Sequence, residues 1–193
     1  MITNTELEYK GDLYPSKIVS YNKEVDSVYF HTDNNVILKI TVLRDSMIRF
    51  RYTTKGYFSK DFSYAIDKSQ SHGYNFLEVN EQKDCYVITT NKVICKIQKS
   101  DLRVAISDLE GNCILEDELG FHWEESYHFG GNIVKMSKAS KDGECFYGLG
   151  DKASHSNLKG KKVENWATDQ YAFHKDQEPL YKVVLKVLSK NIP

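Results

Sequence analysis

The segment from Asn165 to Tyr171 gathers the kinds of side chain that proteins use to bind sugars. It holds a carboxylate at Asp169, an indole at Trp166 and a phenol at Tyr171, together with an amide and a hydroxyl. An aromatic ring can cover the apolar C–H face of a pyranose, and a carboxylate can accept short hydrogen bonds from two sugar hydroxyls. The composition therefore indicates sugar binding, but Trp and Tyr are also ordinary residues of β-sheet proteins.

The segment from Gly148 to Ala153 matches the dinucleotide-binding pattern G-x-G-x-x-[GA] by letter. That pattern binds a pyrophosphate only where it joins a β-strand to the N-terminus of a helix. Here Ser154, His155 and Ser156 follow without an apolar helical face. We interpret the two glycines as part of a tight turn that uses positive φ angles.

The remaining reactive residues form no catalytic or metal-binding pattern. His122 and His128 are six residues apart, a spacing that does not bring two ligands onto one ion in a β-rich chain. Adjacent acids such as Glu124 and Glu125 face opposite sides of a strand and cannot act as a catalytic pair. The four cysteines lack a C-x-x-C motif, so we predict that they are small buried residues. We predict no catalytic residue, no metal and no cofactor.

Composition excludes several classes of partner. The 193 residues carry 26 Lys and Arg against 27 Asp and Glu, a formal charge of −1, which gives no overall field for nucleic acid or an anionic membrane. The first residues lack the basic start and apolar run of a signal peptide. We therefore expect a cytoplasmic protein that binds neither nucleic acid nor membranes.

Hydrophobic and polar residues alternate along much of the chain, which is the pattern of half-buried β-strands. Short turns such as Asn91-Lys92 separate neighbouring runs by hairpin lengths. No segment shows helical spacing over three turns, so the predicted fold is all-β, an antiparallel β-sandwich. The predicted strands are Val36–Val42, Ile48–Tyr52, Tyr86–Thr90, Val93–Ile97, Leu102–Ser107, Cys113–Leu115 and Ile133–Met136.

Three phrases late in the chain follow one another in a recognisable order. They are Cys145–Lys152 (CFYGLGDK), Asn165–Tyr171 (NWATDQY) and Glu178–Lys182 (EPLYK). In this order and spacing they resemble the N-terminal domain of glycoside hydrolase family 31, which contains α-glucosidases and α-xylosidases. Met47–Tyr52 and Asp61–Ala65 resemble earlier strands of the same domain, so the resemblance extends over most of the chain.

The resemblance implies a β-sandwich of the galactose-mutarotase-like kind, in agreement with the alternation. It also implies a following catalytic (β/α)8 barrel that carries the two aspartates of a retaining hydrolase. Such a barrel takes roughly 250 residues, so it is absent here. By resemblance, Asp169 corresponds to an aspartate that contacts sugar hydroxyls, with Trp166 and Tyr171 as neighbours. The implied partners are the barrel and an α-linked oligosaccharide.

We therefore expect residues 1–182 to form the non-catalytic N-terminal domain of an α-glucosidase-like enzyme, followed by a tail, 183–193, that departs from the family pattern. A free strand edge or exposed apolar surface is expected where the barrel would dock. Two alternatives stay open. One is a stand-alone carbohydrate-binding or interaction module, and the other is a mutarotase-like enzyme that recruits His155 or His174 beside a carboxylate.

Overall fold

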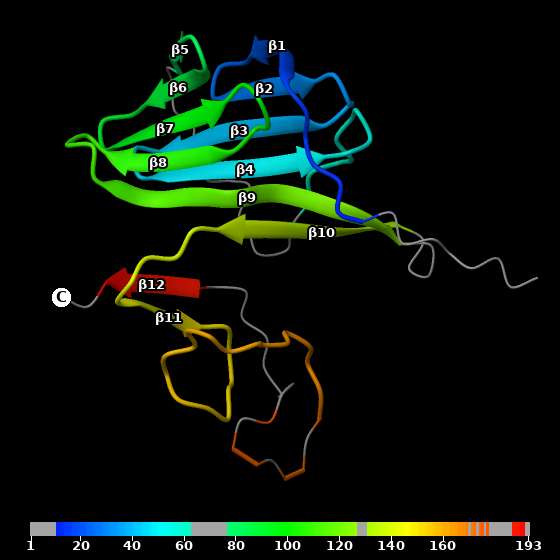
Figure 1. The fold of residues 1–193 in the computed structure, drawn as a ribbon, viewed down its shortest axis with the longest axis vertical. Coiled ribbons are helices and arrows are strands. Elements are labelled where there is room, and N and C mark those ends of the chain that lie inside the picture. The colour runs from blue at the N-terminus through cyan, green and yellow to red at the C-terminus, as the bar shows by residue number, and fades with distance from the viewer. Residues whose placement is uncertain are drawn as a thin grey trace, which may run out of the picture. The chain divides into compact units, whose positions relative to one another are not determined.

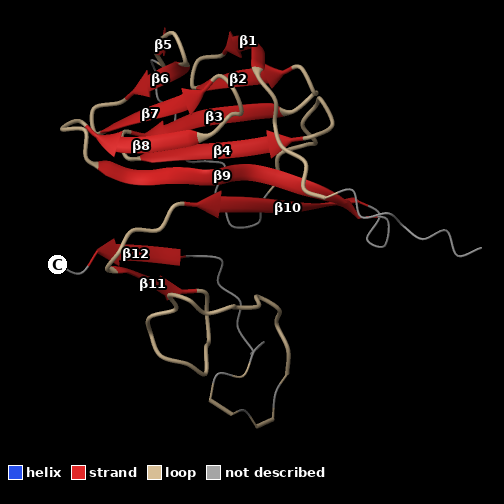
Figure 2. Ribbon diagram, viewed as in Figure 1, coloured by secondary structure: helices blue, strands red, loops and turns tan. Residues whose placement is uncertain are grey.

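The computed structural model describes residues 11–62, 77–126, 131–169, 171–172, 174–175, 177 and 187–191. The chain divides into two compact units, Met1–Ala139 and Ser140–Pro193. Every regular element in the described part of the chain is a β-strand, and neighbouring strands pair antiparallel (Figure 2). This confirms the predicted all-β class. The described residues contain no helix that could cross a membrane.

The first unit holds two sheets (Figure 1). The described residues form a four-stranded sheet in the order β1-β2-β3-β4 and a six-stranded sheet in the order β10-β9-β8-β7-β6-β5. The strands of the first sheet are β1 (Ile18–Lys23), β2 (Ser27–Thr32), β3 (Ile37–Arg44) and β4 (Met47–Thr53). Those of the second are β5 (Val79–Glu81), β6 (Cys85–Thr89), β7 (Val93–Gln98), β8 (Val104–Asp108), β9 (Cys113–Ser126) and β10 (Gly131–Lys138).

The inner faces of the two sheets meet in one hydrophobic core. Val36, Leu38, Ile40 and Val42 are all fully buried there, as the alternation in this segment predicts. Each fully buried aliphatic side chain of this kind contributes about 1.5–3 kcal/mol. The ring of Tyr52 on β4 stacks on Phe121 of β9 with 4.4 Å between ring centroids. The core therefore joins residues that lie far apart in the sequence.

Strand β9 contains a bulge that the sequence pattern did not reveal. Ser137 and Lys138 are neighbours on β10, but they pair with Gly120 and Asp117, which are three positions apart on β9. Glu118 and Leu119 are therefore two extra residues on β9. Gly120 has a φ of +67°, and a Cβ atom there would lie 3.1 Å from a carboxylate oxygen of Asp117. Glycine fits this position because it tolerates positive φ and the close approach.

The carboxylate of Asp117 is fully buried beside this bulge and joins three strands. One oxygen accepts a hydrogen bond from the backbone N–H of Val104 on β8 at 2.8 Å. The other forms an ion pair with the ammonium group of Lys138 at the end of β10. A buried carboxylate is tolerated only when its oxygens are paired in this way. Asp117 therefore fixes where β8, β9 and β10 meet.

The cysteine prediction is correct for two residues and wrong for two. Cys85 and Cys95 are buried, and burial raises the pKa of the Cys95 thiol to about 12. Cys113 is exposed because it is the first residue of β9, and Cys145 is half-buried in the second unit. None of the four forms a disulfide.

The second unit contains one pair of strands among its described residues. Strand β11 (Glu144–Gly148) pairs antiparallel with β12 (Val187–Asn191), with Phe146 opposite Ser189. A long segment without regular secondary structure begins after β11. This segment carries the residues that the sequence predicts to bind sugar.

Replacing Asp117 by Ala should destabilise the chain by about 1–3 kcal/mol, because the buried N–H of Val104 loses its acceptor and Lys138 loses its counterion. Chemical denaturation measures this loss. The matched control is Glu116→Ala, an exposed neighbour on β9, which should change stability by less than about 0.5 kcal/mol. Equal midpoints for the two variants would rule out the role given to Asp117.

Candidate functional site

The candidate site begins at a sharp turn after β11. Gly148, Leu149 and Gly150 have φ angles of 114°, 65° and 86°, three consecutive residues in a region that L-residues rarely adopt. The interpretation of the glycines as a positive-φ turn is confirmed. No helix follows the turn in the described residues, so it lacks the structural context that binds a dinucleotide.

Asn157 ties the next part of the segment back onto β11. Its side-chain oxygen accepts hydrogen bonds from the backbone N–H groups of Phe146 and Lys159, both at 3.1 Å. Its amide nitrogen donates to Sγ of Cys145 at 3.1 Å. The neighbouring residue, Leu158, donates its backbone N–H to the carbonyl of Phe146 at 2.8 Å. These bonds give the segment a defined path without regular secondary structure.

Lys152 connects the turn to the predicted sugar-binding segment. Its ammonium group donates to the backbone carbonyl of Glu164 at 3.1 Å and lies 3.5 Å from the side-chain oxygen of Asn165. Asn165 is directly followed by Trp166, so Lys152 helps to position the start of the NWATDQY phrase. Sequence reasoning gave Lys152 no role, although its place at the end of the CFYGLGDK phrase was a signal.

A shallow groove of about 380 Å³ lies against the same segment of the second unit. Leu158 is buried at its base, and the ammonium-bearing residues Lys159 and Lys161 also line it. Its described lining residues are Phe146, Leu149, Leu158, Lys159, Gly160, Lys161, Val163 and Val187. The groove is thus lined by apolar side chains together with the ammonium-bearing side chains of Lys159 and Lys161.

The three residues predicted to bind sugar are all exposed on this segment. Trp166 is 72% exposed, Tyr171 is fully exposed and Asp169 is also exposed. The expected position of Asp169 on an exposed loop is confirmed. No hydrogen bond or ring contact joins any two of the three within the described residues. Their side chains are available to a ligand, and their sugar-binding role stays a prediction.

The histidines of the mutarotase alternative are exposed as well. His155 lies in the loop without an ion-paired carboxylate among the described residues, and His174 donates its backbone N–H to Gln177. The described part of the chain gathers no group of three residues able to hold a metal ion. The described part of this segment therefore exposes two aromatic rings and a carboxylate.

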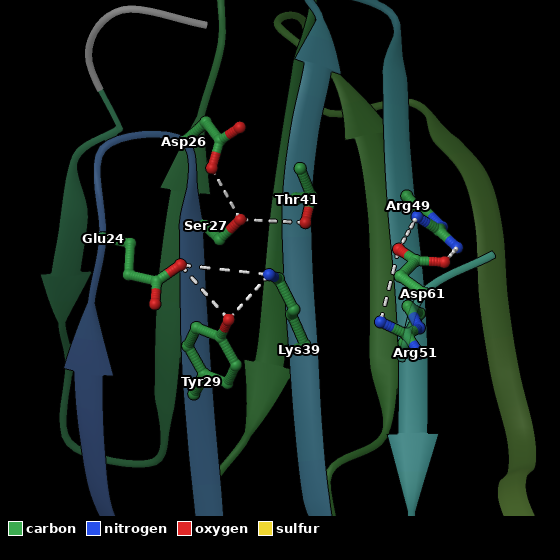
Figure 3. A network of polar contacts seen from close by, with 9 residues as sticks. All are labelled: Glu24, Asp26, Ser27, Tyr29, Lys39, Thr41, Arg49, Arg51 and Asp61. Carbon is green, nitrogen blue, oxygen red and sulfur yellow. Dashed lines mark hydrogen bonds and ion pairs between the residues drawn. The ribbon is translucent and has the colours of Figure 1, made fainter. Parts of the chain in front are cut away.

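A polar network lies on the outer face of the four-stranded sheet (Figure 3). Arg49 holds Asp61 by two hydrogen bonds of 2.6 and 2.9 Å, which keep the pKa of the Asp61 carboxyl below its usual range. Beside them, Lys39 donates to the hydroxyl of Tyr29 at 2.6 Å. These groups pair with one another, so the network anchors the chain around Asp61 to β4.

Comparison with known proteins agrees with this architecture. Residues 37–184 match the family model described as the glycosyl hydrolase 31 N-terminal galactose mutarotase-like domain. Alpha-glucosidase 2 from Bacillus thermoamyloliquefaciens is 26% identical over 180 residues, which cover 92% of this chain and 22% of that protein. The chain thus spans about a fifth of the length of this relative.

Solved structures share the fold over similar lengths. A family 31 dextranase from Flavobacterium johnsoniae, solved with isomaltotriose, has a TM-score of 0.79 and 22% identity over 92% of this chain and 21% of its own. The cycloalternan-forming enzyme from Listeria monocytogenes, solved with a pentasaccharide substrate, has a TM-score of 0.74 and 20% identity over 93% of this chain and 17% of its own. Because the family model matches well over half of the chain, the chain belongs to the glycosyl hydrolase 31 N-terminal galactose mutarotase-like domain family.

Proposed function

We propose that the chain is the non-catalytic N-terminal domain of an α-glucosidase-like retaining glycoside hydrolase. The observation that carries this proposal is the match of residues 37–184 to the family, combined with coverage of only 22% of the α-glucosidase relative. Retaining hydrolysis needs two carboxyl groups about 5 Å apart, one as nucleophile and one as acid/base. In this proposal a separate catalytic barrel supplies both groups, and the present domain packs against that barrel.

The domain also contributes to substrate binding through the loop that carries Trp166, Asp169 and Tyr171. The exposure of all three side chains supports this role, because a buried carboxylate or ring could not reach a sugar. Asp169 would accept hydrogen bonds from hydroxyls of an α-linked oligosaccharide, and a ring would cover an apolar face of the sugar. Binding of this kind raises the rate when the bonds strengthen in the transition state.

The proposal predicts a division of activity between the 193-residue chain and the complete protein that contains it. The chain alone should not hydrolyse p-nitrophenyl α-glucoside, because it lacks the catalytic pair, whereas the complete protein should hydrolyse an α-glucoside or α-xyloside. A chromogenic assay of both purified proteins measures this difference. Turnover by the isolated chain that persists through repeated purification would contradict the proposal.

In the complete enzyme, Asp169→Asn should lower kcat/KM at least about tenfold. The exchange keeps the shape but removes the charge, and a hydroxyl bond to a charged carboxylate contributes roughly 1.5–3 kcal/mol. The melting temperature should hardly change, because Asp169 is exposed. The control is Asp142→Asn, another exposed aspartate of the second unit, which should leave kcat/KM unchanged. A lower melting temperature with intact kcat/KM would mark Asp169 as structural.

The two tryptophans offer a direct binding assay for the stand-alone alternative. Trp123 is 7% exposed and Trp166 is 72% exposed, so acrylamide should quench mainly the emission of Trp166. If the isolated chain binds sugar at this loop, maltose or isomaltose should protect Trp166 from the quencher, and Trp166→Phe should abolish the effect. We expect little protection in the isolated chain. Strong, saturable protection would favour an independent carbohydrate-binding module.

A further inference from the structure

The side chain of Lys152 reaches from the turn after β11 to the start of the segment that carries Trp166 and Asp169. Its ammonium group donates a hydrogen bond to the backbone carbonyl of Glu164 at 3.1 Å and another to the side-chain oxygen of Asn165 at 3.5 Å. These partners lie 12 and 13 positions further along the chain. In Figure 1 this part of the second unit is the loop that leaves β11. Lys152 therefore links the two ends of this stretch of the loop.

The turn before Lys152 and the bonds of Asn157 give this side chain a fixed starting point. The residues Gly148–Gly150 all have positive φ angles, which end the extended path of β11. Further along, the side-chain oxygen of Asn157 accepts a hydrogen bond from the backbone N–H of Phe146 on β11 at 3.1 Å. Lys152 is half-buried and lies between these two points of attachment to β11. Its ammonium group therefore extends from a part of the loop that is itself held in place.

The segment that Lys152 holds has no regular secondary structure to fix its own path. Residues 161–169 contain neither helix nor strand, so hydrogen bonds to other parts of the chain set their direction. Trp166 directly follows Asn165, and Asp169 is four positions beyond Asn165. Four extended residues span at most about 14 Å. An anchor at Asn165 therefore limits the space that the Asp169 carboxylate and the Trp166 ring can reach.

We propose that Lys152 is a positioning residue for sugar binding, which holds the start of the loop so that Asp169 and Trp166 face the substrate of the complete enzyme. This inference rests on the proposed function, because the sugar contacts belong to that function. Lys152 contacts no reacting atom in this role. Its bond to the Glu164 carbonyl is charge-assisted and therefore stronger than a bond between neutral groups. Losing such an anchor matters because a small displacement of a binding group lowers the reaction rate strongly.

A direct contact between Lys152 and the sugar is the competing role. The Lys152 ammonium donates to Glu164 and Asn165, and the side chain is half-buried, whereas Trp166 and Asp169 are exposed. These observations favour positioning. The two roles also differ in what happens once Asp169 is replaced. A direct contact contributes to binding independently of Asp169, whereas a positioning effect that acts through Asp169 disappears with its charge.

The experiment is a double-mutant cycle in the complete protein, measured as kcat/KM on the α-glycoside that it hydrolyses. Lys152→Met removes the N–H donors, keeps most of the side-chain length and should lower kcat/KM about fivefold. In the Asp169→Asn background the same exchange should cost less than about twofold, because the group that it positions has lost its charge. Lys152→Arg keeps a cationic donor and should retain at least about half of the activity. The matched control is Lys162→Met, an exposed lysine of the same loop, which should leave kcat/KM unchanged.

The 193-residue chain gives an independent test of the anchor itself. Limited digestion with chymotrypsin, followed by mass spectrometry, measures cleavage after Trp166, which requires local release of the backbone. Lys152→Met should speed up this cleavage at least about threefold, because the start of the segment is no longer held. Lys162→Met should leave the cleavage rate unchanged. Equal rates for the two variants would overturn the inference.

The outcomes separate this inference from the proposed function. If the complete protein hydrolyses α-glycosides but Lys152→Met has no effect, or lowers kcat/KM by the same factor with and without Asp169→Asn, the positioning role is wrong and the proposed function stands. A Lys152→Arg variant as impaired as Lys152→Met would also overturn the inference. If the complete protein hydrolyses no α-glycoside, the proposed function fails and the role of Lys152 in sugar binding fails with it, while faster cleavage of Lys152→Met would still establish the anchor.

Discussion

The requirement that both sheets of the first unit bury one face against the other determines most of this structure. It explains why Val36, Leu38, Ile40 and Val42 alternate with polar residues, and why their side chains meet those of β6 to β9. The same requirement limits where a charged side chain can be buried between the sheets. Asp117 can be buried only because Lys138 and the backbone of Val104 satisfy both of its oxygens.

Several strands could be predicted from the sequence, among them β10, which is mostly exposed, whereas β2 was missed although it buries Val28 and Phe30. Strand β3 alternates cleanly and was predicted to within about two residues. Strand β1 was missed because it is an edge strand whose side chains are mostly exposed, so selection for apolar alternation is weak. Only the first residues of β9 were predicted, because its bulge interrupts the local pattern. Alternation of apolar and polar residues indicates a strand with one buried face. It gives no signal where the side chains are exposed, as in β1, or where a bulge interrupts the pattern, as in β9.

The candidate site shows a different limit. The chemical types of Trp166, Asp169 and Tyr171 and their common loop were evident from sequence, and their exposure agrees with a binding role. The hydrogen bonds of Asn157 and Lys152 that shape this loop link residues 11 to 13 positions apart. Such bonds leave no periodic trace in a sequence. In the proposed function, a shared sugar contact of these three side chains depends on groups supplied from outside the loop, which no local pattern encodes.

The two extra residues in β9 have a consequence for how this domain tolerates insertions and deletions. Successive residues of a strand point to opposite faces, so an even number of added residues preserves the face of everything that follows. Asp117 before the bulge and Phe121 after it are both buried, and they lie opposite Lys138 and Met136, which share one face of β10. Loss of one bulge residue would reverse Phe121 and Trp123 toward solvent, whereas loss of both would keep them inside. At this point of β9, a deletion or insertion of two residues should therefore be tolerated more readily than a change of one.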